Sequence, residues 1–164
     1  MLLAAAPAAA QPDPVSAFGC RTRALVTDQN LQMVADAYHR HSVTILKMAL
    51  AGDLDRLRDM VDPSAKFEIL LSDDHGVGWD ETGASAAVTF ARAVGPTSYE
   101  FSTAPSGIAL ADPCRETSAE LMLTGRWPDE RVVATFRYRR GLLVGAVARL
   151  VDLTRGDFGS AADR

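Results

Sequence analysis

Apolar and small residues recur at three- and four-residue steps from Thr27 to Ala51, the pattern of a long helix with one buried face. Thr27 is a good helix N-cap, Gly52 ends the helix, and Asp53 caps a second, shorter helix that Pro63 terminates. The apolar and small positions on the buried face of the long helix are Leu31, Val34, Ala35, Tyr38, Ser42, Ile45 and Ala49. The chain is therefore predicted to begin its fold with a helix of about six turns and a short helix after it.

A strand, a loop and a third helix are predicted next. Residues 67–71 form an apolar strand, and the polar, glycine-rich run at 72–78 is typical of a loop. Thr82 caps the third helix, which Gly95 and Pro96 close. All three predicted helices thus come before Pro96.

The second half alternates between apolar and polar residues with period two, which indicates consecutive strands separated by turns. Val132, Ala134, Phe136 and Tyr138 share one face of such a strand, and a hairpin turn at 139–141 leads to the last strand. The predicted strands are 99–103, 108–111, 115–127, 131–139 and 142–153. This order predicts an α+β fold, with a long N-terminal helix and two shorter helices packed on a strongly curved antiparallel sheet. Such a sheet leaves a cone with an open mouth, where a ligand can bind.

Size and charge narrow the classes of function. With 164 residues, 48% of them hydrophobic and 23% charged, the chain is long enough for one domain with its own core. Its net charge is −4 and its 17 basic residues are scattered, so we expect no nucleic-acid partner. No apolar run reaches the roughly 18 residues of a membrane span. Gly76 and Gly78 do not form a phosphate cradle, because no lysine follows them, and we expect no cofactor.

The first residues carry a compartment signal. Residues 1–10 are a small apolar run that ends in Ala-x-Ala before Gln11, which resembles the last part of a secretory signal without its basic start. The run predicts export to the periplasm or beyond. The alternatives are a flexible leader on a cytosolic protein and a start site placed too far downstream. We expect a leader at 1–26, one domain at 27–155 and a flexible tail at 156–164.

Two cysteines, Cys20 and Cys114, are the only ones in the chain. An even pair in an exported protein predicts a disulfide, which would tie the N-terminal segment to the sheet. The alternative is two unrelated buried thiols. No histidines flank these cysteines, so we expect no metal site there.

Three stretches of the sequence resemble the nuclear transport factor 2-like (NTF2-like) superfamily, which includes ketosteroid isomerases and polyketide cyclases of the SnoaL type. They are the Ala-Gly-Asp-Leu-Asp run at 51–55, the strand at 65–70, and Phe136-Arg137-Tyr138 followed by Gly141. The resemblance covers about residues 28 to 153. It implies a cone-shaped α+β fold with a ligand pocket inside.

The resemblance also locates three catalytic positions of the isomerases. A tyrosine donor corresponds to Ile45, the general base to Ile69, and a protonated acid to Ala134. Dienolate chemistry needs a base and donors aimed at the oxyanion, and isoleucine and alanine supply neither. The resemblance therefore implies the fold and the pocket without the isomerase activity.

We interpret the protein as a module that binds a small apolar or amphipathic molecule inside the cone. Trp79 is expected to act as a lid. The expected ligand-binding residues are Tyr38, His41, Ile45, Phe67, Ile69, Trp79, Phe90, Leu121, Ala134 and Phe136.

Two other functions remain open. An acid/base isomerase, dehydratase or cyclase of SnoaL type would use a relocated site with Tyr38, His41 and Asp74, although Asp74 lies in a run of ordinary turn composition. Alternatively, the cavity is filled and the outer sheet face, with Met122, Val133 and Thr135, serves homodimerisation. A homodimer through that face is the expected assembly in the binding interpretation as well.

Overall fold

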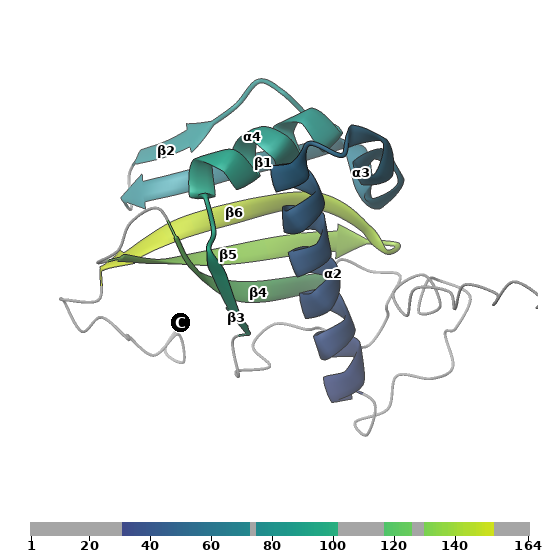
Figure 1. The fold of residues 1–164 in the computed structure, drawn as a ribbon, viewed down its shortest axis with the longest axis horizontal. Coiled ribbons are helices and arrows are strands. Elements are labelled where there is room, and N and C mark those ends of the chain that lie inside the picture. The colour runs from purple at the N-terminus through teal and green to yellow at the C-terminus, as the bar shows by residue number, and fades with distance from the viewer. Residues whose placement is uncertain (1–30, 73–74, 102–116, 126–129, 153–164) are drawn as a thin grey trace, which may run out of the picture.

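The computed structural model describes residues 31–72, 75–101, 117–125 and 130–152 (Figure 1). Several predictions therefore lie outside the described residues. They are the leader at 1–26 with its export signal, Cys20 and Cys114, Asp74, the strand at 108–111 and the tail after residue 155.

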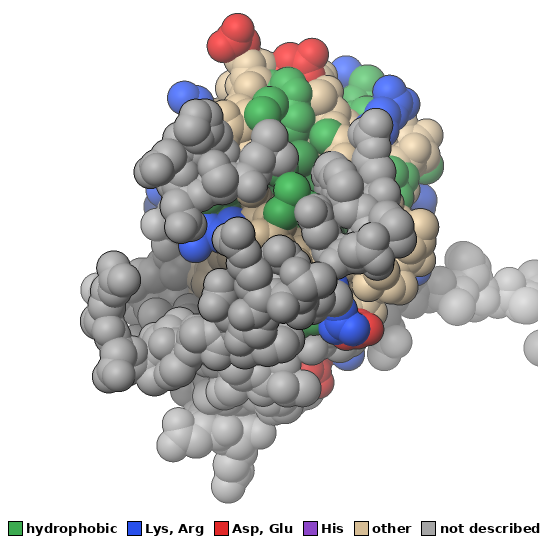
Figure 2. Space-filling model, turned by 90° about the vertical axis from the view of Figure 1, so that its left-hand side faces the viewer, with side chains coloured by type: hydrophobic (Ala, Val, Ile, Leu, Met, Phe, Trp, Pro, Cys, Tyr) green, Lys and Arg blue, Asp and Glu red, His purple; other side chains and the backbone are tan. Residues whose placement is uncertain are grey.

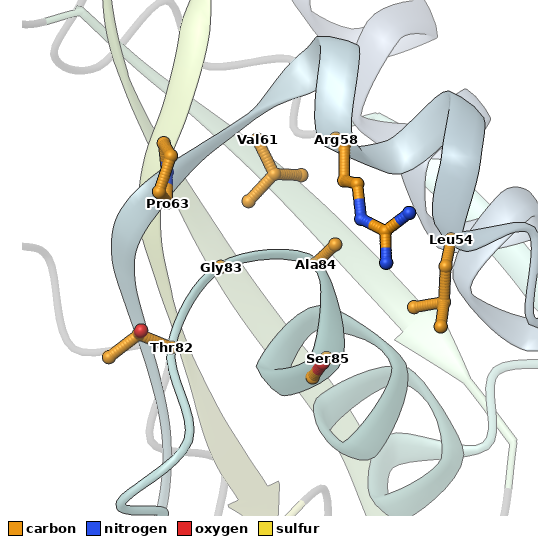
Figure 3. Close-up of a pocket in the computed structure, with 8 residues that line it drawn as sticks. All are labelled: Leu54, Arg58, Val61, Pro63, Thr82, Gly83, Ala84 and Ser85. Carbon is orange, nitrogen blue, oxygen red and sulfur yellow. The ribbon is translucent and has the colours of Figure 1, made fainter.

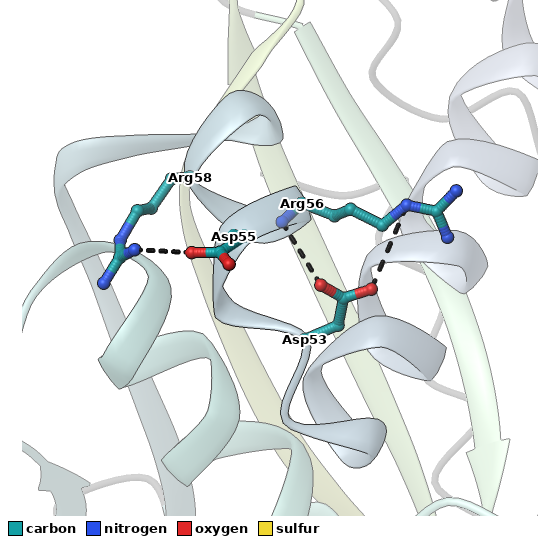
Figure 4. Close-up of polar contacts among 4 residues, drawn as sticks. All are labelled: Asp53, Asp55, Arg56 and Arg58. Carbon is teal, nitrogen blue, oxygen red and sulfur yellow. Dashed lines mark hydrogen bonds and ion pairs between the residues drawn. The ribbon is translucent and has the colours of Figure 1, made fainter.

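Three helices of the described residues occupy the predicted positions: α2 (Leu31–Ala51), α3 (Leu54–Met60) and α4 (Gly83–Val94). Gly52 adopts a φ of 72°, which the turn between α2 and α3 requires and which glycine reaches without strain. The Asp53 carboxylate then accepts a hydrogen bond of 3.3 Å from the backbone N–H of Arg56, so it caps α3 as expected (Figure 4). Gly95 ends α4 in the left-handed conformation.

In the described part of the chain, six strands form one sheet in the order β2-β1-β6-β5-β4-β3. β1 and β6 pair in parallel, and the other neighbours are antiparallel. The strands are β1 (Val61–Ser72), β2 (His75–Gly78), β3 (Ser98–Phe101), β4 (Thr117–Thr124), β5 (Glu130–Arg139) and β6 (Leu142–Asp152). The predicted α+β class with a mostly antiparallel sheet is confirmed.

The first strand begins earlier than the sequence predicts. β1 starts at Val61, six residues before the expected start at Phe67, and Pro63 lies inside it. Its pairing with β6 shifts register between Val61 and Lys66, so the proline, which has no N–H, sits in an irregularity of the ladder. Pro63 thus follows the end of the short helix, as predicted, and it also lies in the irregular first part of β1.

A second difference concerns the expected loop at 72–78. Residues His75–Gly78 form β2, which pairs antiparallel with β1 through Glu68 opposite Gly78 and Leu70 opposite Gly76. The glycines of this run are typical of turns, but the neighbouring strand supplies hydrogen bonds that no local pattern reveals. The prediction of a loop here was wrong for these four residues.

The helices lie on one side of the sheet (Figure 1). α4 packs mainly on β1 and α2 packs on β4, so β5 and β6 run between the two lines of helix contact. The predicted alternation is confirmed, because Ala134, Phe136 and Tyr138 are at most 1% exposed while Arg137 and Arg139 are exposed. Inward-facing residues of the sheet thus meet both helices in one core.

No helix in the described part of the chain is both long enough and apolar enough to cross a membrane.

Candidate functional site

The side chains expected to line the cone converge on the space between the helices and the sheet. Eight of the ten belong to one buried cluster: Tyr38, Ile45, Phe67, Ile69, Phe90, Leu121, Ala134 and Phe136. Of the other two, His41 is buried, at 7% exposure, and Trp79 is half-buried against the core. The structure therefore brings the residues of the binding hypothesis to one place, from α2, α4 and four different segments of the sheet and its connections.

Aromatic rings form the wall on the α4 side of this interior. Phe90 of α4 lies with its ring centre 5.4 Å from that of Phe67 and 6.4 Å from that of Phe136. Trp79 approaches Phe90 edge-on, with 6.5 Å between ring centres. Tilted and edge-on packing of this kind holds rings in defined positions. These rings therefore form one packed cluster, and Trp79 is its most exposed member.

Small side chains form the floor. Ala134 of β5 lies opposite Ala148 of β6, and Phe136 lies between Ala119 and Ala146 on the two flanking strands. Four methyl groups thus surround one aromatic ring on the inward face, and all four alanines are at most 2% exposed. Because α4 packs mainly on β1 and α2 on β4, the strands that carry most of these methyl groups run between the two lines of helix contact.

One end of the interior is polar. Ser42 Oγ of α2 lies 2.6 Å from Tyr138 Oη of β5, and it donates a 2.9 Å hydrogen bond to the backbone carbonyl of Tyr38. A serine hydroxyl has a single proton, so Tyr138 is the donor in the bond between the two side chains. Burial raises the pKa of Tyr138 far above its usual range, and the bond with Ser42 opposes this shift only in part. Tyr138 is therefore a neutral hydroxyl at every physiological pH.

The two helix residues proposed for chemistry lie at this same end. The ring of Tyr38 is centred 4.9 Å from that of Tyr138, and the ring of His41 is centred 5.6 Å from it. Burial raises the pKa of the Tyr38 hydroxyl as well. The structure thus groups Tyr38 and His41, whereas Asp74, the third residue of the enzyme hypothesis, lies outside the described residues.

Sequence reasoning missed three members of this polar end: Ser42, Tyr138 and Thr117. Thr117 of β4 is opposite Tyr138, is 3% exposed, and its hydroxyl has no hydrogen-bond partner among the described residues. One signal was available, because period two puts Thr117 on the same strand face as Ala119 and Leu121. A hydroxyl on an otherwise apolar inward face deserved a place among the candidates.

The three positions that correspond to the isomerase catalytic residues are all inward. Ile45, Ile69 and Ala134 are 1%, 5% and 0% exposed. The interior is hydrocarbon at these points, as the sequence indicated.

Among the described residues, two pockets lie elsewhere, beside α3 and α4. The larger has a volume of about 380 Å³ and lies between α3, the start of β1 and the first turn of α4 (Figure 3). Its lining residues are Leu54, Arg58, Val61, Pro63, Thr82, Gly83, Ala84 and Ser85. The guanidinium of Arg58 at its edge pairs with Asp55 at 2.7 Å, and both side chains are largely exposed (Figure 4). None of the expected ligand-binding residues lines this pocket.

The side of the molecule where β5 begins and β6 ends is partly apolar. Figure 2 shows a strip of hydrophobic side chains in the upper half of this side, with acidic and basic ones around it. In the same described part of the chain, no three His, Cys, Asp or Glu side chains gather as a metal-binding group.

No protein-family model matches the chain, and no curated protein matches it. Solved structures are similar to it at low identity. An NTF-2 like protein of unknown function from Silicibacter pomeroyi DSS-3 is 11% identical, over 76% of this chain and 100% of that one, with a TM-score of 0.43. Another, from Burkholderia xenovorans LB400, is 15% identical over 69% and 81%, with a TM-score of 0.41.

An LEH-like epoxide hydrolase of M. tuberculosis is also similar, with 15% identity over 71% of this chain and 86% of that one and a TM-score of 0.38. The arrangement described above, three helices on a mostly antiparallel curved sheet, is the α+β cone that the sequence resemblance to NTF2-like proteins implies. These likenesses concern the fold alone.

Proposed function

We propose that the space between α2, α4 and the inward sheet face binds a small apolar or amphipathic molecule. The observation that carries the proposal is that the side chains facing this interior are almost all hydrocarbon. Ile45, Ile69 and Ala134 stand at the positions that correspond to the polar catalytic residues of the isomerases. Alanine methyl groups form the sheet side of the interior. Each ligand CH₂ that leaves water for such a surface contributes about 0.8 kcal/mol.

The same lining selects against charged ligands. Among the described residues, the buried polar side chains apart from tyrosines are His39, His41, Ser42 and Thr117. None of them is a carboxylate, an amine or a guanidinium. A charged group brought among them would lose its hydration without a permanent counter-ion, so a ligand charge belongs at the solvent end.

The experiment is extraction of freshly purified protein followed by mass spectrometry, together with melting curves in a panel of sterols, polyketides and aromatic metabolites. A bound compound, or a rise in melting temperature with one member of the panel, is the expected result. Protein that carries nothing and that no compound stabilises would refute the binding function.

A variant with a larger side chain in the interior tests where the ligand binds. Ala134→Leu adds three carbon atoms to the floor and is expected to abolish binding. Val133→Leu, one residue along on the outer face, is the matched control and is expected to keep it. Binding that survives Ala134→Leu in a folded protein would place the ligand elsewhere.

An acid/base enzyme of isomerase, dehydratase or cyclase type is the second candidate. Its favouring observation is that an imidazole and two phenols, from His41, Tyr38 and Tyr138, meet at the polar end of the interior. His41 would serve as the base. Turnover of any identified substrate that persists unchanged in His41→Ala and in Asp74→Asn would exclude those roles.

We also propose that two copies associate through the outer face of the sheet. Met122, Val133 and Thr135 are half-buried there. One cross-strand row of this face carries Lys66 and Arg137, and the next row carries Glu68 and Glu120. A two-fold axis would set the basic row of one copy against the acidic row of the other.

Light scattering tests this assembly. The wild-type protein is expected to be a dimer and Val133→Arg a monomer, with Val77→Arg on β2, where Val77 is already 44% exposed, as the control that stays dimeric. A monomeric wild type at micromolar concentration would refute it.

Export and the disulfide are likewise proposals. The supporting features are the Ala-x-Ala run before Gln11 and the single pair of cysteines, Cys20 and Cys114. Intact mass of the protein from its native host tests both. Removal of the leader and a mass two hydrogens below that of the dithiol are the expected results.

A further inference from the structure

Thr117 carries a buried hydroxyl that the described fold does not use. Its side chain is 3% exposed, and its Oγ1 has no hydrogen-bond partner among the described residues. Leaving a buried donor unpaired is costly, so native proteins usually pair such a group or use it. Tyr138, which lies opposite Thr117 on the neighbouring strand, forms its hydrogen bond with Ser42 and not with Thr117.

The position of Thr117 is continuous with the proposed ligand space. Along β4 the inward residues are Thr117, Ala119 and Leu121, so only a methyl group separates the hydroxyl from the apolar floor. On the neighbouring strand Tyr138 occupies the paired position. A molecule lying over Ala119 would therefore reach Thr117 with one end.

We propose that the Thr117 hydroxyl donates a hydrogen bond to a neutral oxygen of the bound molecule, at the polar end of the interior. This inference rests on the proposed binding function and deepens it. It defines the ligand class as an apolar body that ends in a ketone, ester or ether oxygen. Thr117 would then discriminate such a ligand from a pure hydrocarbon of the same shape.

The ligand oxygen that Thr117 binds is expected to be uncharged, because no permanent positive charge is buried near it in the described part of the chain. The Ser42–Tyr138 pair and Thr117 supply dipoles and no formal charge. The buried imidazole of His41 lies at the same end, but it is not a permanent cation, and the described buried side chains include no Lys or Arg. A carboxylate in that position would lose its hydration for hydrogen bonds alone. An acceptor such as a carbonyl loses far less and gains a donor that otherwise has no partner.

The first test measures the ligand-free protein. Thr117→Val replaces the hydroxyl with a methyl group of the same shape, so its melting temperature is expected to equal or exceed that of the wild type. A fall of more than about 3 °C would show that the hydroxyl has a structural partner, and it would overturn the proposal.

The second test uses two probes of matched shape, acetylnaphthalene and ethylnaphthalene, with binding followed by calorimetry. The wild type is expected to prefer the ketone. Thr117→Val is expected to lose roughly tenfold in affinity for the ketone and to bind the hydrocarbon as the wild type does. Thr117→Ser, which keeps the hydroxyl, is expected to restore the preference, and Thr135→Val on the outer face to leave it unchanged.

The outcomes separate the two proposals. If neither probe binds the wild type, the binding function fails for apolar aromatic molecules and this inference falls with it. If both probes bind but Thr117→Val leaves the preference for the ketone intact, binding stands and the role of Thr117 is refuted.

Discussion

The two faces of the sheet are built from alternate residues of the same strands, yet their chemistry is opposite. In β5 the inward residues Ala134, Phe136 and Tyr138 are at most 1% exposed. Their neighbours Arg137 and Arg139 are exposed. Period two alone therefore divides this strand between the buried core and the outer surface.

The faces also treat polar groups differently. On the outer face Arg131 pairs with Glu100 at 3.1 Å, and both remain partly open to solvent. On the inner face Tyr138 bonds Ser42 of the covering helix α2 at 2.6 Å, out of contact with water. An exposed pair is easily replaced by water, whereas a buried one is not, so a small number of inner hydroxyls matter more than many outer charges.

The largest effect that would test this comparison is at Phe136. Phe136→Ala removes a fully buried ring from among four alanines, which offer nothing to refill the space, and is expected to cost about 3–5 kcal/mol of unfolding free energy. Arg137→Ala, its exposed neighbour, is expected to change stability by less than about 0.5 kcal/mol. Urea unfolding measures both. Equal losses in the two variants would contradict the division between the faces.

Two hydroxyls on one helix give a sharper comparison. Ser42 and Thr44 each donate to the carbonyl four residues earlier in α2, but Ser42 is buried against Tyr138 and Thr44 is exposed. Ser42→Ala leaves the Tyr138 hydroxyl buried without its partner and is expected to cost about 1–3 kcal/mol. Thr44→Ala is expected to be near neutral. If Ser42→Ala were also neutral, the polar end of the interior would tolerate an unpaired phenol.

Gly145 is a position on the outer face that leaves no room for a larger side chain. A Cβ added there would lie 2.7 Å from the backbone oxygen of Lys66 and 3.2 Å from the Arg137 guanidinium. Gly145→Ala must therefore push β1 from β6 where their register shifts, at an expected cost of about 1–2 kcal/mol. Thr135→Ala on the same face is the control. Thermal unfolding in which the two variants match would show that the strands can separate freely.

The smallest expected effect concerns pH. Burial lowers the pKa of His39, against the opposing pull of Asp36 and Glu120. The unfolded chain thus binds the proton more tightly, so this stability is fully present above the unfolded pKa of about 6.5 and is lost as pH falls below that value through the lower folded pKa. His39→Gln is expected to reduce the loss of unfolding free energy between pH 7.5 and 5.5 by under about 1 kcal/mol. An unchanged pH profile would assign the dependence to other groups.

Much of the fold could be predicted from local patterns. Helix α2 ends at Ala51, Asp53 caps α3, and Gly95 closes α4, because capping and glycine conformation depend on neighbours in the chain. The hairpin at Arg140 and Gly141, both with positive φ, follows the same logic. The early start of β1 and the strand β2 could not be predicted, because partner strands create them.

The candidate site divides in the same way. Its hydrocarbon part was predictable, since Ile45, Ile69 and Ala134 lie at inward positions of their own helix and strands. Its polar end could be predicted only in part. Tyr38 and His41 stood out in the sequence, but their grouping with Tyr138 depends on where α2 crosses the sheet.

By itself, the sequence determined which positions are apolar, where the chain turns and which residues of each element share a face, because these depend on periods of two and 3.6 residues and on local capping. Only the tertiary structure decided that Ser42 bonds Tyr138, 96 residues away, and that Thr117 is left without such a partner among the described residues. A contact between distant residues depends on strand register and helix placement, and both are settled by the packing of the whole core.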